Sequence, residues 1–299
     1  MATIVIVSAF TLGVTSYENH AAARIATFNR LKTDARELEV RLHAVAEDVA
    51  KDARFMASLP PIQGVIRARS DKEGKEDSEQ VWQTRLQTIY QGLLEANPNY
   101  LSASYLGAIE KSAKEIVRVE RFSSGSFVRV LPQSRLSLLE LSGLLLHTLE
   151  MKPGDVLLDE VPLKMEHEDE HKDNLGELVL TATIPIYDDI GGDVVGLVAI
   201  ETDLEEQIKN LLVTTIESGQ AVYVISGEGR IVLQYSRKQD FQQQNIGKPI
   251  GEVVEGTTSF FSPDSPAHRL KISDESYATW VVLDQRHTSA QIGFLLVTE

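Results

Sequence analysis

The sequence predicts an α+β protein in which a long N-terminal helix precedes two tandem modules, each built on an antiparallel sheet. Three observations predict this class. Residues 18–57 contain no Pro or Gly and are rich in helix-forming residues. Short apolar segments separated by turn residues follow, and they are typical of strands. Segments 181–203 and 278–299 both read as two long apolar strands joined by a turn, a weak internal repeat that indicates two related modules.

The composition of the 299 residues restricts the functions of the chain. Its formal charge is −15, and such a chain repels phosphate backbones, which argues against nucleic acid as a partner. It contains no Cys, which excludes disulfides, thiol nucleophiles, iron–sulfur clusters and zinc–thiolate sites. We expect no cofactor.

The first 17 residues contain no charged side chain, and the first charge is that of Glu18. About 17 apolar residues are the shortest stretch that spans a bilayer as a helix, and Tyr17 stands where an interfacial aromatic would. We therefore interpret residues 1–17 as the end of a transmembrane helix, and we expect the chain to be a fragment of a longer protein, cut near the start of that helix. A signal peptide and a buried core helix remain open as alternatives.

The long helix is predicted over residues 18–60 and ends near Pro60 and Pro61. Its apolar residues recur in steps of three and four, the spacing of a heptad stripe: Phe28, Leu31, Ala35, Leu38, Leu42, Val45 and Val49. We expect the half of this stripe farther from residue 1 to pack on the chain's own domain. The nearer half is expected to pair with a second copy in a homodimer.

Apolar periodicity and turn signals locate the other elements. Helices are predicted at 62–69, 81–97, 137–150 and 203–217. Strands are predicted at 100–108, 115–122, 126–131, 156–163, 176–188, 194–203, 221–226, 230–236, 269–276, 277–285 and 291–299. The third helix is expected to begin with a capping box, in which Ser137 and Glu140 satisfy the first backbone N–H groups. Residues 70–79 read as a charged loop.

The order of these segments resembles a known family. A long helix is followed by NPNYLSASYLG (97–107), KEIVRVER (114–121), TIPIYDDIGGDVVGLVAIETDL (183–204) and AVYVISGEGRIVL (221–233). This order is similar to that of the double Cache, or tandem PAS-like, extracytoplasmic sensor domains of bacterial and archaeal membrane receptors. The resemblance covers residues 18–299, and it lies in the order and spacing of short, degenerate motifs.

The resemblance implies a function and a division of the chain. Residues 61–203 would form a membrane-distal PAS-like module that binds a small molecule such as an amino acid or a carboxylate. Residues 204–299 would form a linking helix and a smaller membrane-proximal module, and residues 18–60 would be the signalling helix. The domain would lie outside the cytoplasm of a receptor in the cell membrane.

The signalling output of such receptors is most often a histidine kinase, and sometimes a diguanylate cyclase or a chemoreceptor. No catalytic sequence of these classes occurs in the chain, so the chain itself is not predicted to be an enzyme.

One arginine is the first candidate for a ligand-binding residue. Strand alternation in residues 115–122 places Ile116, Arg118 and Glu120 on one face, and Val117 on the other. If the valine side packs on the long helix, Arg118 faces the ligand, and its guanidinium suits a carboxylate or phosphate. Pairing of Arg118 with a neighbouring Glu at the sheet rim is an equally weighted alternative.

Five further residues complete the predicted ligand site. Tyr105 would supply an aromatic wall and a hydroxyl, although a core position is an alternative. Thr181 and Thr183 share one face of a strand, and their hydroxyls suit a polar ligand, with plain strand propensity as the alternative. Tyr187 and Asp188 end that strand. Asp188 would bind an ammonium group, or it is an ordinary turn residue.

The acidic tract 166–173 contains the letters HEDEH, which formally match a zinc-protease motif. Charged residues flank it instead of an apolar helical stripe, so we expect a solvated loop without metal. Three other functions stay open: a structural, partner-binding module without a small ligand, a sensor with a metal-binding acidic patch, and a metal-dependent hydrolase that uses His167, Glu168 and His171.

Overall fold

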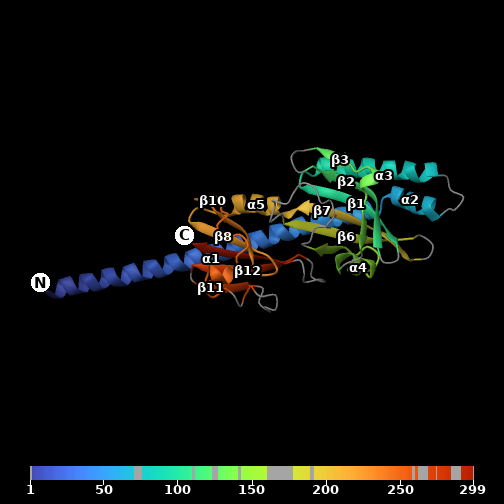
Figure 1. Cartoon of the computed structure of the whole chain (residues 1–299). Helices are drawn as coiled ribbons and strands as arrows, with labels where there is room; N and C mark the ends of the chain where they lie inside the picture. Colours follow the sequence, from blue (N-terminus) through green and yellow to red (C-terminus); the bar gives the residue numbers. More distant parts are fainter. Residues whose placement is uncertain are drawn as a thin grey trace. The chain divides into compact units, whose positions relative to one another are not determined.

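A computed structural model gives the fold (Figure 1). It describes residues 2–70, 76–109, 112–122, 127–140, 143–159, 178–188, 192–257, 260–261, 269–273, 275–283 and 291–298. The predicted α+β class is confirmed, since a long N-terminal helix precedes two antiparallel sheets.

Three helices precede the first sheet. Helix α1 (Ala2–Ala57) is uninterrupted, and α2 (Pro60–Ser70) and α3 (Glu76–Ala96) follow it. The break between α1 and α2 lies at the two prolines, as the sequence predicted. Helix α3 ends at Ala96, two residues before Pro98, which has no backbone N–H to continue the helix.

The first sheet has seven strands. They are β1 (Tyr100–Ile109), β2 (Ser112–Arg121), β3 (Val128–Val130), β4 (Leu138–Glu140), β5 (Leu157–Asp159), β6 (Val179–Tyr187) and β7 (Val194–Asp203). Their order is β3-β2-β1-β7-β6-β5, with β4 also paired to β2, and every pairing is antiparallel. The 3₁₀ turn η1 (Gln133–Arg135) and helix α4 (Gly143–Leu149) lie between these strands in the chain.

The second sheet has six strands. They are β8 (Gln220–Ile225), β9 (Ile231–Ser236), β10 (Asp240–Phe241), β11 (Arg269–Ser273), β12 (Ser276–Val282) and β13 (Gln291–Thr298). Their order is β10-β9-β8-β13-β12-β11. Helix α5 (Leu204–Thr215) precedes this sheet, and the 3₁₀ turn η2 (Ile250–Glu252) follows β10. Asp203 caps α5, accepting a hydrogen bond of 2.8 Å from the Glu206 N–H.

The chain divides into two compact units. The β1–β7 unit comprises His43–Lys209 and Leu283–Ala290, and the β8–β13 unit comprises Met1–Leu42, Asn210–Val282 and Gln291–Glu299. The module boundary that we predicted between residues 203 and 204 stays a prediction. It falls where β7 ends and α5 begins.

The predicted helix at 137–150 is wrong in its first part. Residues 138–140 form β4, which pairs with β2, and α4 begins only at Gly143. The backbone of Ser137 exchanges hydrogen bonds with Glu115 of β2: its N–H donates to Glu115 Oε2 (2.9 Å) and its carbonyl accepts from the Glu115 N–H (3.0 Å). Pairing along β2 therefore outcompetes the local capping box.

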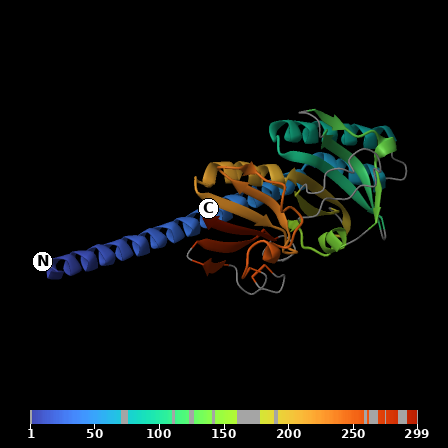
Figure 2. The same cartoon turned by 60° about the vertical axis from the view of Figure 1, so that its left-hand side comes forward.

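The heptad stripe of α1 packs on the chain's own β8–β13 unit from Leu31 onward. Leu31, Ala35, Leu38 and Leu42 are fully buried, and the half-buried Phe28 ring packs edge-on against Tyr277. Figures 1 and 2 show the N-terminal part of α1 projecting beyond the second sheet, and residues 22–26 are exposed. Packing of the farther half on its own domain is confirmed. Leu31 and Ala35 of the nearer half are buried in the same unit, so the pairing with a second copy that we predicted for that half is left to residues N-terminal to Phe28, where it stays a prediction.

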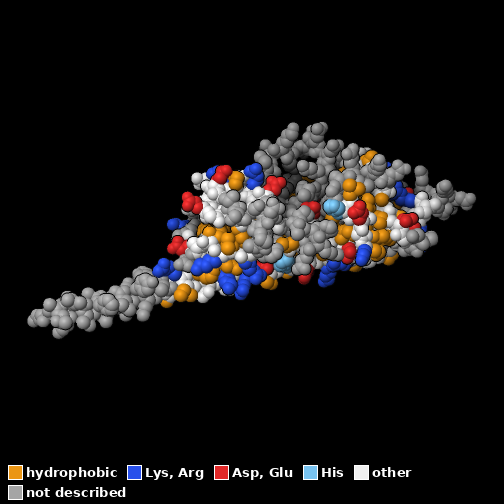
Figure 3. All heavy atoms as spheres, turned by 90° about the horizontal axis from the view of Figure 1, so that it is seen from below, with side chains coloured by type: hydrophobic (Ala, Val, Ile, Leu, Met, Phe, Trp, Pro, Cys, Tyr) orange, Lys and Arg blue, Asp and Glu red, His pale blue; other side chains and the backbone are white. Residues whose placement is uncertain are grey.

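Polar contacts also join α1 to the β8–β13 unit. Asp34 accepts a hydrogen bond of 2.8 Å from Gln220 Nε2, and both side chains are buried. Glu39 pairs with Arg269 at 2.7 Å, and Arg30 pairs with Glu217. Figure 3 shows Lys and Arg side chains gathered where α1 meets this unit.

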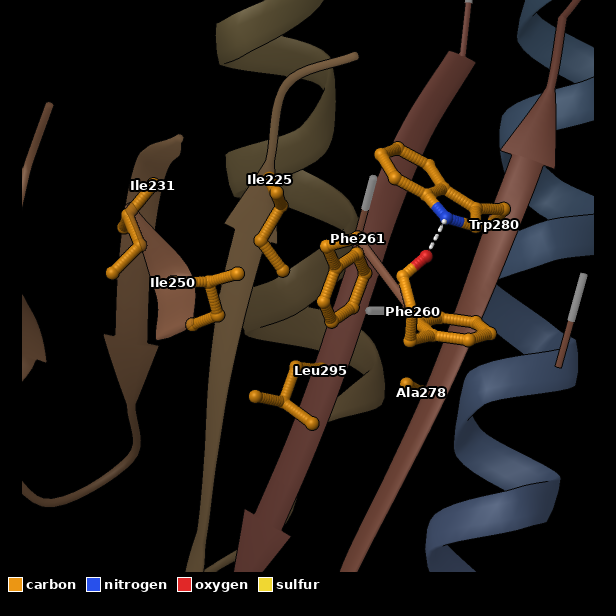
Figure 4. Close-up of a cluster of buried hydrophobic side chains, with 8 residues drawn as sticks. All are labelled: Ile225, Ile231, Ile250, Phe260, Phe261, Ala278, Trp280 and Leu295. Carbon is orange, nitrogen blue, oxygen red and sulfur yellow. Dashed lines mark hydrogen bonds between the residues drawn. The ribbon is translucent and has the colours of Figure 1, made fainter. Parts of the chain in front are cut away.

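An apolar cluster fills one face of the second sheet (Figure 4). Its members are Ile225, Ile231, Ile250, Phe260, Phe261, Ala278, Trp280 and Leu295. The Trp280 indole N–H donates a 3.0 Å hydrogen bond to the Phe260 carbonyl, which satisfies the one polar group of that side chain. Position 293 requires glycine, because a Cβ there would lie 2.5 Å from the Phe261 ring.

Within the described residues, no helix combines the length and apolarity needed to cross a membrane. Residues 2–17 are helical, as expected, and their role as a membrane anchor stays a prediction.

Candidate functional site

A β-bulge between Tyr105 and Leu106 decides which side chains of β2 share a face. Ser104 pairs with Arg118 and Tyr105 with Val117, but Leu106 pairs with Glu115. Glu115 therefore lies on the face of Arg118, whereas Ile116 lies on the opposite face. Our prediction that Ile116 shares the face of Arg118 is wrong, because a bulge reverses the alternation and leaves no mark in the sequence.

The strand register arranges the face of Arg118 in rows that cross the sheet. Paired residues of neighbouring strands point to the same side and lie about 5 Å apart. One row runs through Arg129, Glu120, Ser102, Glu201, Thr181 and Asp159. The next row runs through Arg118, Ser104, Ala199, Thr183 and Leu157. We call this surface the polar face of the first sheet.

Arg118 is enclosed by carboxylates on the polar face. Its Nη2 donates to Glu201 Oε2 at 3.1 Å, and its Nε donates to Glu120 Oε2 at 3.4 Å. Its Nη1 lies 3.5 Å from Glu115 Oε1. The alternative that Arg118 pairs with a neighbouring Glu is therefore observed, with three glutamates in place of one.

Hydroxyls and a second guanidinium extend this network. Ser104 Oγ accepts a 3.4 Å hydrogen bond from Arg118, and the Ser102 hydroxyl donates to Glu201. Arg129 donates two hydrogen bonds to Glu120 Oε1, of 2.8 and 2.6 Å. The network is largely buried, with Arg118 8% and Glu201 5% exposed.

Two opposing effects act on the guanidinium. Burial lowers the pKa of Arg118, but the attraction of Glu201, Glu115 and Glu120 more than offsets this, so its pKa is raised. Arg118 is therefore cationic, as arginine is in proteins generally. Buried among carboxylates, it fixes their positions as much as they fix its own.

Helix α4 covers the end of the polar face that carries the other predicted residues. The hydroxyl oxygens of Thr148 in α4 and Thr183 in β6 lie 2.6 Å apart, and the Tyr187 hydroxyl donates to the Met151 carbonyl. Thr181 and Thr183 are both fully buried. The structure thus brings Arg118, Thr181, Thr183 and Tyr187 to one side of the sheet. As sites of ligand contact they stay predictions.

Tyr105 lies on the opposite face of the sheet, against which α3 packs. In Figure 1, α3 and α4 lie on opposite sides of this sheet. Burial, the largest effect, raises the pKa of the Tyr105 hydroxyl. The charge of Arg69 in α2 lowers this pKa, and that of Glu79 in α3 raises it. Tyr105 is 1% exposed. The structure therefore does not bring it together with Arg118, and it fits the core position that we kept as the alternative.

Asp188 begins the turn between β6 and β7. Its carboxylate accepts a 3.2 Å hydrogen bond from the Asp193 N–H, and its own N–H donates to the Asp193 carbonyl at 3.0 Å. These are the contacts of the turn residue that the sequence offered as an alternative.

Sequence reasoning missed Glu201, Glu115 and the two serines of β1. A signal for Glu201 existed, since it is the one charged residue of segment 194–202 and follows the uncharged run 194–200. A carboxylate in such a strand requires a cation partner. The position of that partner depends on strand order and register, which the sequence alone does not provide.

The acidic tract 166–173 lies outside the described residues. Within the described part of the chain, no group of three or more His, Asp or Glu side chains is placed to hold a metal ion.

Comparison with known proteins gives a likeness in fold. No protein-family model matches the sequence, and no curated protein matches it. Among solved structures, a domain of a sensory box/GGDEF family protein from Vibrio parahaemolyticus is 11% identical, with a TM-score of 0.58 over 91% of this chain and 96% of that chain.

Two further structures support the same likeness. The extracellular domain of vpHK1S-Z8, named as a histidine kinase, has a TM-score of 0.57 at 11% identity, over 94% of this chain and 95% of that chain. The ligand-binding domain of the Campylobacter jejuni chemoreceptor Tlp3, in complex with 4-methylisoleucine, has a TM-score of 0.53 at 13% identity. That match covers 92% of this chain and 91% of the solved Tlp3 domain. The chain has the fold of such sensory domains, so the resemblance to double Cache domains is confirmed at the level of fold.

Proposed function

We propose that the chain is the extracytoplasmic ligand-sensing domain of a transmembrane receptor, most consistent with a sensor histidine kinase, and that it binds a small organic molecule on the polar face. The observation that carries this proposal is the buried row of charged and hydroxyl side chains across the first sheet. Burying so many polar groups costs free energy. Clusters of this kind are more typical of a binding site than of a structural core. The fold of a sensory domain supports the same function.

The ligand is assigned to the β1–β7 unit because the second sheet, in the residues that the structure describes, buries polar side chains but no charged one. The corresponding cluster of the β8–β13 unit consists of apolar side chains, and its one indole N–H already has a partner. In the proposed receptor, the β1–β7 unit is the membrane-distal module and residues 1–17 anchor the chain. Two copies pair through the N-terminal part of α1.

Signalling would be a shift between two populated states. A ligand that binds one arrangement of the polar face better stabilises it by the difference in binding free energy. Helix α1 belongs to both units without interruption, so a change in its packing in one unit is carried along the helix to the other.

A thermal-shift screen of amino acids and small carboxylates on the full chain tests the proposal. A ligand at 100 times its Kd stabilises the folded state by about 2.7 kcal/mol, which raises Tm by roughly 5–10 °C. Thr181→Val, on the polar face, is expected to reduce the shift. Thr279→Val is the matched control, since Thr279 is an equally buried strand residue of the other unit.

The proposal fails if no member of the screen raises Tm. It fails equally if Thr181→Val and Thr279→Val respond to the ligand alike.

A further inference from the structure

Carboxylates outnumber cations on the polar face. Among the described residues there, two guanidiniums, those of Arg118 and Arg129, stand beside four carboxylates. The carboxylates belong to Glu115, Glu120, Glu201 and Asp159. Arg118 already lies within 3.5 Å of three of them. An anionic ligand at Arg118 would add a further carboxylate to this group, whereas a cationic ligand would reduce the excess of negative charge.

Glu120 has the geometry to receive such a ligand. Its Oε1 accepts both bonds from Arg129, whereas the one donor to its Oε2 among the described residues is Arg118 Nε, at 3.4 Å. A carboxylate oxygen accepts about two hydrogen bonds, so Oε2 has capacity for a closer donor. The Glu120 side chain is 19% exposed, more than that of Glu115 or Glu201, so it lies where the network meets solvent.

The row that contains Glu120 continues with acceptors. Ser102 lies between Glu120 and Glu201, since it pairs with both across the neighbouring strands. Thr181 and Asp159 follow on the next two strands. Successive members lie about 5 Å apart, so hydroxyls and carboxylates alternate along about 20 Å of the sheet. Such a row suits an aliphatic primary ammonium, whose three N–H donors bond carboxylates and hydroxyls alike.

The formal charges of the two units also favour a cationic ligand in the β1–β7 unit. The β1–β7 unit contains 18 basic and 31 acidic residues, a formal charge of −13, whereas the β8–β13 unit contains 11 and 13, a charge of −2. Nearly all the negative charge of the chain therefore belongs to the unit that carries the polar face. A field of this sign raises the local concentration and the association rate of cationic solutes.

We propose that the ligand of the polar face carries a primary ammonium group, bound by Glu120 and Glu201, and that Arg118 is a positioning residue which holds these carboxylates. The proposal rests on the function proposed above and names the ligand class of that same site. It reverses the expectation from the sequence that Arg118 binds the ligand's carboxylate.

A panel of matched compounds tests the proposal. The full chain is assayed by thermal shift with L-leucine and the other common amino acids, with their decarboxylated amines such as 3-methylbutylamine, with putrescine, and with their deaminated acids such as 4-methylpentanoate. Compounds with an ammonium group are expected to raise Tm, and the deaminated acids are not. Stabilisation by a deaminated acid overturns the ligand class but leaves the proposed function standing. A flat response to the whole panel contradicts both.

Two variants locate the ammonium. Glu120→Gln and Glu201→Gln keep the shape of the side chain and remove its charge, and each is expected to weaken binding by about tenfold to a hundredfold. The matched control is Glu79→Gln, which removes a partly exposed carboxylate on the helix-covered side of the same unit. Each ligand-induced shift is measured against the variant's own unliganded Tm, so altered stability does not obscure it. Affinities unchanged in both variants would overturn the assignment.

Discussion

Replacing Arg118 by methionine tests whether the network on the polar face is the electrostatic unit that the geometry describes. The substitution keeps an unbranched side chain and removes the guanidinium, which lies 3.1–3.5 Å from three carboxylates. Glu115 and Glu201 are only 1% and 5% exposed, so solvent compensates little for the loss. Removal of one partner from a buried ion pair costs about 3–5 kcal/mol, and we expect Arg118→Met to destabilise the β1–β7 unit by that amount.

A double-mutant cycle separates this effect from lost packing. In the Arg118→Met background, Glu201→Gln removes a carboxylate that has lost its cation, so the double variant should regain about 1–3 kcal/mol relative to additivity. Urea unfolding followed by circular dichroism gives the free energies of unfolding. Arg121→Met is the comparison variant, because it removes a guanidinium of the same strand that donates to the backbone carbonyls of Tyr100 and Asn97. A loss below 1 kcal/mol in Arg118→Met, or strict additivity in the cycle, would refute the account of the network.

Three further predictions concern the rest of the molecule. Leu38→Ala should cost about 2–5 kcal/mol because Leu38 is fully buried, whereas Val40→Ala, two residues along α1 and 68% exposed, should cost less than about 0.5 kcal/mol; equal costs in urea unfolding would contradict the packing of the stripe. Gly293→Ala should cost about 1–3 kcal/mol, since its Cβ would lie 2.5 Å from the Phe261 ring, and an unchanged Tm would show that the cluster in Figure 4 is loosely packed. Burial raises the pKa of Tyr90, Tyr100 and Tyr105, so the unfolded chain releases these protons from about pH 10 while the folded chain retains them. Stability from these groups is therefore full below pH 10 and falls above it, by up to about 1.4 kcal/mol per pH unit for each tyrosine. Tyr90→Phe should make this fall shallower at little cost at pH 7, since the Tyr90 hydroxyl has no hydrogen-bond partner among the described residues, and an unchanged slope between pH 9 and 11 would argue against the assignment.

Much of the fold follows from local pattern in the sequence. The uninterrupted α1, the ends of α2 and α3, the strands β1, β2 and β6–β9 and the Asp203 cap all depend on residues close together in the chain. The heptad spacing of α1 predicted an apolar stripe, and the structure shows that its farther half packs on the chain's own domain. Where a long-range pairing competes with a local signal, the sequence misleads, as at residues 137–140.

The candidate site was predictable only in part. Strand alternation indicated a polar side for Arg118 and for the two threonines of β6. The bulge at Tyr105/Leu106, however, exchanged Ile116 for Glu115 on that side. The partnership of Arg118 with Glu201 joins residues 83 positions apart, on strands that are not themselves neighbours in the sheet. Such a contact depends on the order of strands, which no local pattern encodes.

Hydrogen–deuterium exchange of the full chain, with and without a saturating stabilising compound from the panel, tests the central claim most directly. The account predicts slower amide exchange in β1, β2, β6 and β7, where the ligand would contact the polar face, and little direct protection in β8, β9, β12 and β13. Protection confined to the β8–β13 unit, or absent from both sheets despite a raised Tm, would contradict it.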